Sequence, residues 1–238
     1  TLSGAELQNI TATGLTIGDA TNGSITVNNI TAANSNNITG TVTLNATLDN
    51  SIVTFATAAS IFNALTASAD DGIVVDVTVT TDVGGLALEG DADNAADTAT
   101  TGDKVTFAAG LVIASAGAIT LDATTGGIDG AGALTLNAVG GVTLNNNLTS
   151  AGTTTIDTDT DNNGVGDFIS NAGILATGGA TLSITANDIT LTGTINSGAG
   201  ATSILVSDAG TIGLGDTAGG FTLSGAELQN ITATGLTI

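Results

Sequence analysis

The sequence of 238 residues predicts an all-β fold and, within that class, a right-handed parallel β-helix, or solenoid, of about 20 residues per coil. Three observations point there: short stretches in which apolar residues alternate with Thr, glycine-rich turns between these stretches, and apolar residues that are mostly small or β-branched. Such a chain can fill a narrow core along a fibre, because each coil of a solenoid buries its apolar face against its neighbours.

Alternating stretches recur along the whole chain. Clear examples are residues 24–28 (SITVN), 41–45 (TVTLN) and 73–80 (IVVDVTVT). Every second side chain of a strand points to the same face, so these patterns place apolar residues on one face and Thr on the other. Further stretches of this kind are residues 105–107, 118–122, 133–137, 142–145, 181–185, 189–192, 204–207 and 221–224.

Gly, Asn, Asp and Ser separate the strands, and these residues accept the positive φ angles that turns require. One segment departs from the alternation: residues 57–70 (TAASIFNALTASAD) could place Ile61, Phe62 and Leu65 on one face of a helix. We expect a short helix or a loop there. A β-sandwich is disfavoured because the chain has no Trp or Tyr to anchor its core. At about 20 residues per coil, the chain would form about 11 coils and span on the order of 50 Å.

The two ends of the chain carry the same sequence. Residues 1–17 and 222–238 both read TLSGAELQNITATGLTI. We therefore expect residues 1–221 to be one full long repeat and residues 222–238 to be the start of the next. The second copy should then occupy the same coil position one repeat further along. A terminal cap or a swapped strand is the alternative.

The chain is strongly acidic. It has 22 Asp and Glu residues against the single cation Lys104, which gives a formal charge of −21. Binding to nucleic acid and to anionic membranes depends on Lys and Arg, so neither is expected as a partner. No apolar stretch is long enough for membrane insertion. The absence of His, Cys and Tyr removes the common general bases and nucleophiles, and we expect that the protein is not an enzyme, with no catalytic residues.

Residues 157–167 (DTDTDNNGVGD) form the candidate metal site. Asp157, Asp159 and Asp161 alternate and are followed by Gly164 and Asp167, a pattern that resembles a calcium loop. Phe168 stands where an EF-hand would place its bidentate Glu, and a solvated acidic turn is the alternative. A second, weaker cluster holds Glu89, Asp91, Asp93 and Asp97. The expected cofactor is therefore either none or Ca²⁺ in a structural role.

Several phrases carry a resemblance to a known family: residues 117–127 (GAITLDATTGG), 132–152 and 180–198. They resemble filamentous-haemagglutinin-type surface proteins and the giant β-strand-repeat exoproteins of Gram-negative bacteria. The resemblance implies a right-handed parallel β-helix, secretion to the extracellular space or cell surface, and a role as an adhesin, filament or stalk.

We accordingly expect a structural segment of an extracellular fibre, stalk or surface filament built from tandem β-helical repeats. Its partners would be neighbouring copies of the same repeat, joined end to end or laterally. The alternative is an adhesin module that contacts a host or neighbouring-cell surface through loops such as residues 91–103. A calcium-stiffened chain of immunoglobulin-like domains would show units of about 100 residues, which the strand spacing does not suggest.

Overall fold

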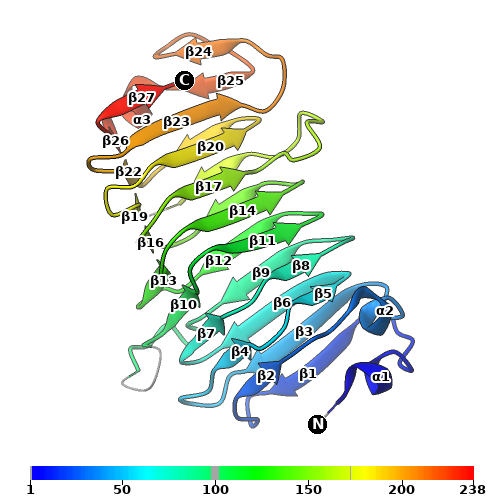
Figure 1. Ribbon diagram of the computed structural model, residues 1–238. Coiled ribbons are helices and arrows are strands. Elements are labelled where there is room, and N and C mark those ends of the chain that lie inside the picture. Colours follow the sequence, from blue (N-terminus) through cyan, green and yellow to red (C-terminus); the bar gives the residue numbers. More distant parts are fainter. Residues whose placement is uncertain (1, 98–101, 172) are drawn as a thin grey trace.

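The computed structural model describes residues 2–97, 102–171 and 173–238. Nearly all of its strands belong to three parallel sheets that run the length of the molecule (Figure 1). After the first coil, the chain passes from sheet 1 to sheet 2 to sheet 3 and returns to sheet 1 one coil further on. This arrangement is a parallel β-helix, so the predicted fold class is confirmed.

The three sheets share the same construction, with short strands stacked in order along the molecule. Sheet 1 consists of β1 (Leu15–Asp19), β3 (Thr41–Ala46), β6 (Ala64–Ala69), β9 (Leu86–Glu89), β12 (Ile119–Asp122), β15 (Val142–Leu144), β18 (Phe168–Ser170) and β21 (Ile189–Leu191). Sheet 2 consists of β2 (Ile25–Val27), β4 (Val53–Phe55), β7 (Gly72–Val75), β10 (Lys104–Phe107), β13 (Gly127–Gly130), β16 (Leu148–Ser150), β19 (Ile174–Ala176), β22 (Thr194–Asn196) and β26 (Ile231–Thr232). Sheet 3 consists of β5 (Ser60–Phe62), β8 (Val79–Thr81), β11 (Leu111–Ser115), β14 (Leu134–Ala138), β17 (Thr154–Asp157), β20 (Leu182–Ala186), β23 (Ala201–Val206) and β27 (Gly235–Thr237).

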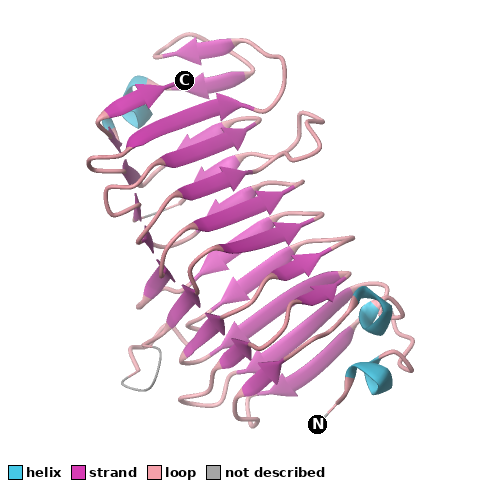
Figure 2. Ribbon diagram, in the orientation of Figure 1, coloured by secondary structure: helices cyan, strands magenta, loops and turns pink. Residues whose placement is uncertain are grey.

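Two smaller features lie at the ends of the solenoid. A two-stranded parallel sheet, β24 (Ile212–Leu214) and β25 (Phe221–Leu223), lies at the C-terminal end. The helices are single turns at the two ends (Figure 2), namely α1 (Gly4–Leu7), α2 (Ala32–Ser35) and α3 (Gly225–Gln229).

The expectation of a short helix or loop at residues 57–70 was wrong. This segment forms β5 and β6, and Leu65, Ala67 and Ala69 are buried at every second position of β6. Its Ala-rich composition suits a helix, but β6 pairs with β3 on one side and β9 on the other. Backbone pairing on both edges and burial of one face override the weak local propensity.

Coil length varies along the molecule. Val53 pairs with Ile73, and Ile128 pairs with Leu148, so these two coils have the predicted length. Ile73, however, pairs with Val105, and this coil is much longer because residues 90–103 separate β9 from β10. In the described part of the chain, sheets 1, 2 and 3 hold eight, nine and eight strands. The predicted number of coils was therefore too high.

The core is a set of stacked apolar columns. In sheet 1, for example, the inward side chains are aligned by the strand register and all are buried: Val42, Leu65, Leu86, Ile119, Val142, Phe168 and Ile189. Thr residues form matching rows outside, where Thr43 aligns with Thr66 and Thr120 with Thr143. The alternation read from the sequence thus sorts side chains between core and solvent.

Buried hydroxyl groups support the corners between sheets. Thr81 Oγ1 donates to Gly84 O at 2.6 Å, and Ser115 Oγ donates to Ala118 O at 3.2 Å. Farther along the molecule, Ser197 Oγ donates to Gly200 O at 2.9 Å. In each case the hydroxyl contacts a carbonyl in the turn that follows, and at Ala118 and Gly200 it adds to a backbone hydrogen bond from the Leu86 and Thr234 amides.

Candidate functional site

The predicted calcium loop, residues 157–167, lies between β17 and β18, and Asp159 anchors it. Asp159 is fully buried. Its oxygens accept hydrogen bonds from the Asn163 and Gly164 amides at 3.1 and 3.2 Å and from Ser207 Oγ at 2.6 Å. Burial alone would raise the pKa of Asp159, but the hydrogen bonds, with that from Ser207 foremost, lower it below its ordinary value. The carboxylate therefore holds the loop closed through protein donors.

The other three predicted ligands in this loop each accept a hydrogen bond from a different donor. Asp157 Oδ1 accepts from the Asp159 amide at 3.3 Å, Asp161 Oδ2 from Asn163 Nδ2 at 2.8 Å, and Asp167 Oδ1 from Asn187 Nδ2 at 3.0 Å. Among the described residues, no three of the four carboxylates bring an oxygen each within 4.8 Å of one another. Calcium binding by Asp157, Asp159, Asp161 and Asp167 stays a prediction.

A different set of carboxylates does converge. Oxygens of Asp49, Asp70 and Asp97 lie within 4.8 Å of one another. These residues come from the loops that follow β3, β6 and β9, which are three successive crossings from sheet 1 to sheet 2 (Figure 1). Asp91 and Asp103 lie in the third of these loops. We call these five residues, Asp49, Asp70, Asp91, Asp97 and Asp103, the acidic corner.

Asp91 and Asp103 share one hydroxyl donor. Thr125 Oγ1 lies 2.8 Å from Asp91 Oδ2 and 3.0 Å from Asp103 Oδ2. Backbone amides add to both: Thr125 N donates to Asp91 Oδ2 at 2.7 Å, and Asp97 N donates to Asp103 Oδ2 at 2.9 Å. A hydroxyl has one proton and cannot serve both carboxylates at once. The pair is therefore short of donors.

Three carboxylate oxygens in the acidic corner are buried without a partner. Asp91 and Asp103 are only 0% and 2% exposed, and no donor among the described residues reaches Asp91 Oδ1, Asp103 Oδ1 or Asp97 Oδ2. Burying an ionised oxygen without a hydrogen bond is unfavourable, and Asp91 and Asp103 are the two of these three side chains that are almost inaccessible to solvent. Within the described part of the chain, these three oxygens therefore lack a proton, hydrogen-bond donor or cation that would stabilise them.

The pKa values of two acids in this region are raised, which shows that their ionised forms are poorly stabilised. Desolvation raises the pKa of Asp97 to about 6, and Asp70, Asp103 and Asp49 add to the rise. Burial also raises the pKa of Glu89 to about 7, with smaller increases from the charges of Asp122 and Asp91. Asp122 lies directly beside Glu89 in the register of β12 and β9. Like charges on adjacent coils thus add to the effect of burial in opposing the ionisation of Asp97 and Glu89.

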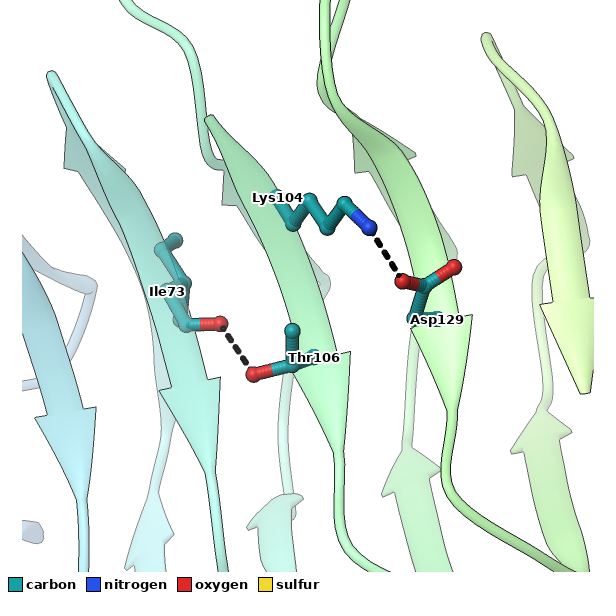
Figure 3. Close-up of polar contacts among 4 residues, drawn as sticks. All are labelled: Ile73, Lys104, Thr106 and Asp129. Carbon is teal, nitrogen blue, oxygen red and sulfur yellow. Dashed lines mark hydrogen bonds and ion pairs between the residues drawn. The ribbon is translucent and has the colours of Figure 1, made fainter. Parts of the chain in front are cut away.

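Lys104, the single Lys or Arg of the chain, does not pair with the acidic corner. It directly follows the buried Asp103 and begins β10, in which Lys104 and Thr106 are partly exposed whereas Val105 and Phe107 are buried. Its Nζ contacts Asp129 Oδ2 on the next strand at 2.7 Å, with both side chains partly exposed. Figure 3 shows this ion pair between neighbouring strands, with Thr106 on the same strand as Lys104 and its hydroxyl donating to Ile73 O at 3.4 Å. The acidic corner therefore has no lysine or arginine as counter-ion.

Sequence reasoning found only part of this cluster. It grouped Glu89, Asp91, Asp93 and Asp97 by proximity along the chain, but Asp93 is exposed and accepts a local hydrogen bond from the Ala95 amide at 2.8 Å. Asp49 and Asp70 were missed because they lie on earlier coils. The available signal was an acidic residue recurring just after two consecutive sheet 1 strands, about one coil apart.

The second notable surface is the open N-terminal end of the solenoid. A cavity of about 990 Å³ opens there, with a mostly apolar lining that includes Leu2, Leu7, Ile17, Ile25, Val27 and Leu44. The strands β1, β2 and β5 are the last strands of their sheets at this end, so each pairs on one edge only. Exposed backbone edges and an uncovered core are the features by which solenoid coils stack.

Comparisons with family models, curated proteins and solved structures give no match to this chain. No helix in the described part of the chain is long and apolar enough to cross a membrane.

Proposed function

We propose that the chain is a structural segment of an extracellular fibre, stalk or surface filament built from tandem β-helical repeats. The observation that carries the proposal is the open N-terminal end, where free sheet edges surround an apolar cavity, in a chain whose two ends repeat one sequence. A neighbouring repeat would supply the coil that covers this cavity and pairs with these edges.

The two copies of the repeated sequence illustrate what such a neighbour would do. Leu2 in the first copy is 41% exposed and lines the open cavity. Its equivalent in the second copy, Leu223, is fully buried because β25 lies beside β24 and follows a complete set of coils. Chain on the N-terminal side of the first copy would bury Leu2 in a similar way. The partners proposed here are therefore copies of the same repeat joined end to end.

Location outside the cell and a non-catalytic role are parts of the same proposal. They are supported by the resemblance to filamentous-haemagglutinin-type surface proteins and by a composition without His, Cys or Tyr. The adhesin alternative gains no specific support from residues 91–103, of which 98–101 lie outside the described residues. Asp91 and Asp103, which bracket that loop, are buried and not displayed for a partner.

A series of chains with one, two and three copies of the repeat unit, residues 1–221, tests the proposal. With eight or nine strands per sheet, each unit should add about 40 Å to a rod of constant width. Small-angle scattering and electron microscopy measure both dimensions. A flexible string of separate beads, or a rod whose width grows with each unit, would contradict the proposal.

A further inference from the structure

We propose that the acidic corner binds a calcium ion through the carboxylates of Asp49, Asp70 and Asp97. This site is distinct from the loop at residues 157–167, and the inference does not depend on the fibre function. The ion would join three successive coils at the crossings from sheet 1 to sheet 2.

The first argument is geometric. Calcium takes oxygen ligands at about 2.3–2.6 Å, so oxygens on opposite sides of one ion lie about 4.6–5.2 Å apart. One oxygen each from Asp49, Asp70 and Asp97 already meets this limit. The three loops arrive at one place because the parallel register stacks the turns that follow β3, β6 and β9. The ligand set therefore follows from the regular part of the fold.

The second argument is the set of partnerless oxygens. Asp97 Oδ2 is buried and has no donor among the described residues, and Asp97 N donates to Asp103, whose own Oδ1 is also unpartnered. Asp103 itself is 2% exposed. Buried ionised groups in folded proteins are paired or coordinate metals. Since Lys104 is bound to Asp129, no lysine or arginine side chain compensates these oxygens.

The ligand chemistry selects calcium over magnesium. Three carboxylates from three loops offer many hard oxygens in an adaptable arrangement, which suits the six to eight ligands of calcium. Magnesium demands near-ideal octahedral geometry and keeps several waters, typically with one or two protein carboxylates. The local protein supplies negative charge beyond the three ligands through Asp91 and Asp103, and this excess favours a divalent cation over sodium.

Binding would stabilise the position of Asp97 in the connection that follows β9. In the absence of the ion, the carboxylates of Asp49, Asp70 and Asp97 repel one another. With the ion bound, the same groups tie the loop of Asp97 to the two preceding turns. The chain should therefore melt at a temperature several degrees higher in calcium than in chelator.

The test uses calorimetric titration of the full chain with CaCl₂ and thermal melting followed by circular dichroism, because the chain has no Trp or Tyr for fluorescence. Measurements at neutral pH in physiological salt suppress nonspecific attraction to the net charge. Wild type should bind one calcium at this corner. Asp97→Asn and Asp70→Asn should each weaken that binding by about tenfold or more, because each removes a ligand charge.

A crossed comparison separates coordination from a merely structural role. In chelator, Asp97→Asn should melt higher than wild type because it removes repulsion, whereas in calcium it should melt lower because it removes a ligand charge. Asp82→Asn is the matched control, since Asp82 is exposed and lies outside the corner. It should leave calcium affinity unchanged.

Several results would overturn the inference. They are the absence of binding heat and of a melting shift in wild type, calcium affinity unchanged in both Asp97→Asn and Asp70→Asn, or an equal response to MgCl₂. Loss of binding in Asp161→Asn, with Asp97→Asn unaffected, would assign calcium to the loop at residues 157–167 instead. If Asp70→Asn fails to fold, the crossed melting behaviour of Asp97→Asn still decides the question.

Discussion

The two copies of the repeated terminal sequence form the same helix but enter different sheets. In the first copy, the Ser3 amide donates to Glu6 Oε2 at 2.8 Å and α1 follows. In the second, the Ser224 amide donates to Glu227 Oε2 at 2.9 Å and α3 follows. This reciprocal capping needs only residues three positions apart, so it forms wherever the sequence occurs.

The strands that follow these helices differ. In the first copy, β1 begins at Leu15 and pairs with β3 in sheet 1, whereas the equivalent residue Leu236 lies in β27 and pairs with β23 in sheet 3. The expectation that both copies occupy the same coil position was therefore wrong for this chain. The second copy packs on the preceding coils, where Ile231 and Thr232 pair with Ile195 and Asn196 of β22. The first copy pairs only with the coils that follow it.

The comparison shows which interactions fix structure at each level. A helix cap depends on local residues, so it forms in both copies. The placement of a strand depends on which strand edge is available, so it differs between the copies. Leu2 and Leu223 differ in burial for the same reason, and so do Leu7 and Leu228. The same substitution can therefore be made at two equivalent positions that have the same local sequence but different packing.

The largest difference is expected for the first leucine of each copy. Leu223→Ala should lower the free energy of unfolding by about 3 kcal/mol, since it leaves a cavity around a fully buried side chain. Leu2→Ala should cost about 1 kcal/mol or less, because Leu2 is 41% exposed. Urea unfolding followed by circular dichroism measures both. Equal costs would contradict the burial difference. In a chain extended by a preceding repeat, Leu2→Ala should become as costly as Leu223→Ala.

The order should reverse for the leucine inside each helix. Leu7 is 3% exposed, so Leu7→Ala should cost about 2 kcal/mol or more. Leu228 is only half-buried, and Leu228→Ala should cost roughly half as much. The same unfolding assay applies to both variants. A larger loss for Leu228→Ala would show that α3 is packed more tightly than the structure indicates.

Glu227 should contribute more than Glu6 because it also contacts the solenoid. Its Oε1 accepts a hydrogen bond from the Leu191 amide at 3.1 Å, in addition to the capping contacts with Ser224. Glu227→Gln should destabilise the protein by about 1 kcal/mol. Glu6→Gln, which loses only local contacts with Ser3, should have a smaller effect in parallel melts. If both variants melt alike, the contact to Leu191 adds nothing.

Acidic pH should weaken the second copy through the same carboxylate. Burial acts to raise the pKa of Glu227, but hydrogen bonds from Ser224 and Leu191 outweigh it and hold the pKa below the ordinary 4.5. The stabilisation is therefore present above about pH 4.5 and is lost as pH falls through the lowered pKa. In that acidic range, wild type should lose stability more steeply than Glu227→Gln as the pH is lowered. Parallel curves for the two proteins would rule out this contribution.

The sequence predicts the regular part of the fold because burial in a strand has a period of two, and that signal is local. The Ser3–Glu6 and Ser224–Glu227 pairs are also readable as capping boxes, although such short helices carry no apolar periodicity. The acidic corner was only partly predictable. Asp97 meets Asp49 and Asp70 through coil register, and the loop that contains Asp97 makes its coil much longer than the coil before it.

A structure of two repeats in one chain tests the central claim most directly. Cryo-electron microscopy should show sheets that run unbroken through residues 222–238, with strands spaced by about 4.8 Å and chain packed on both sides of the shared sequence. Leu223, the equivalent of Leu2 at that junction, should remain buried as it is here. A gap between two separate solenoids, with the apolar cavity still open to solvent, would contradict the account.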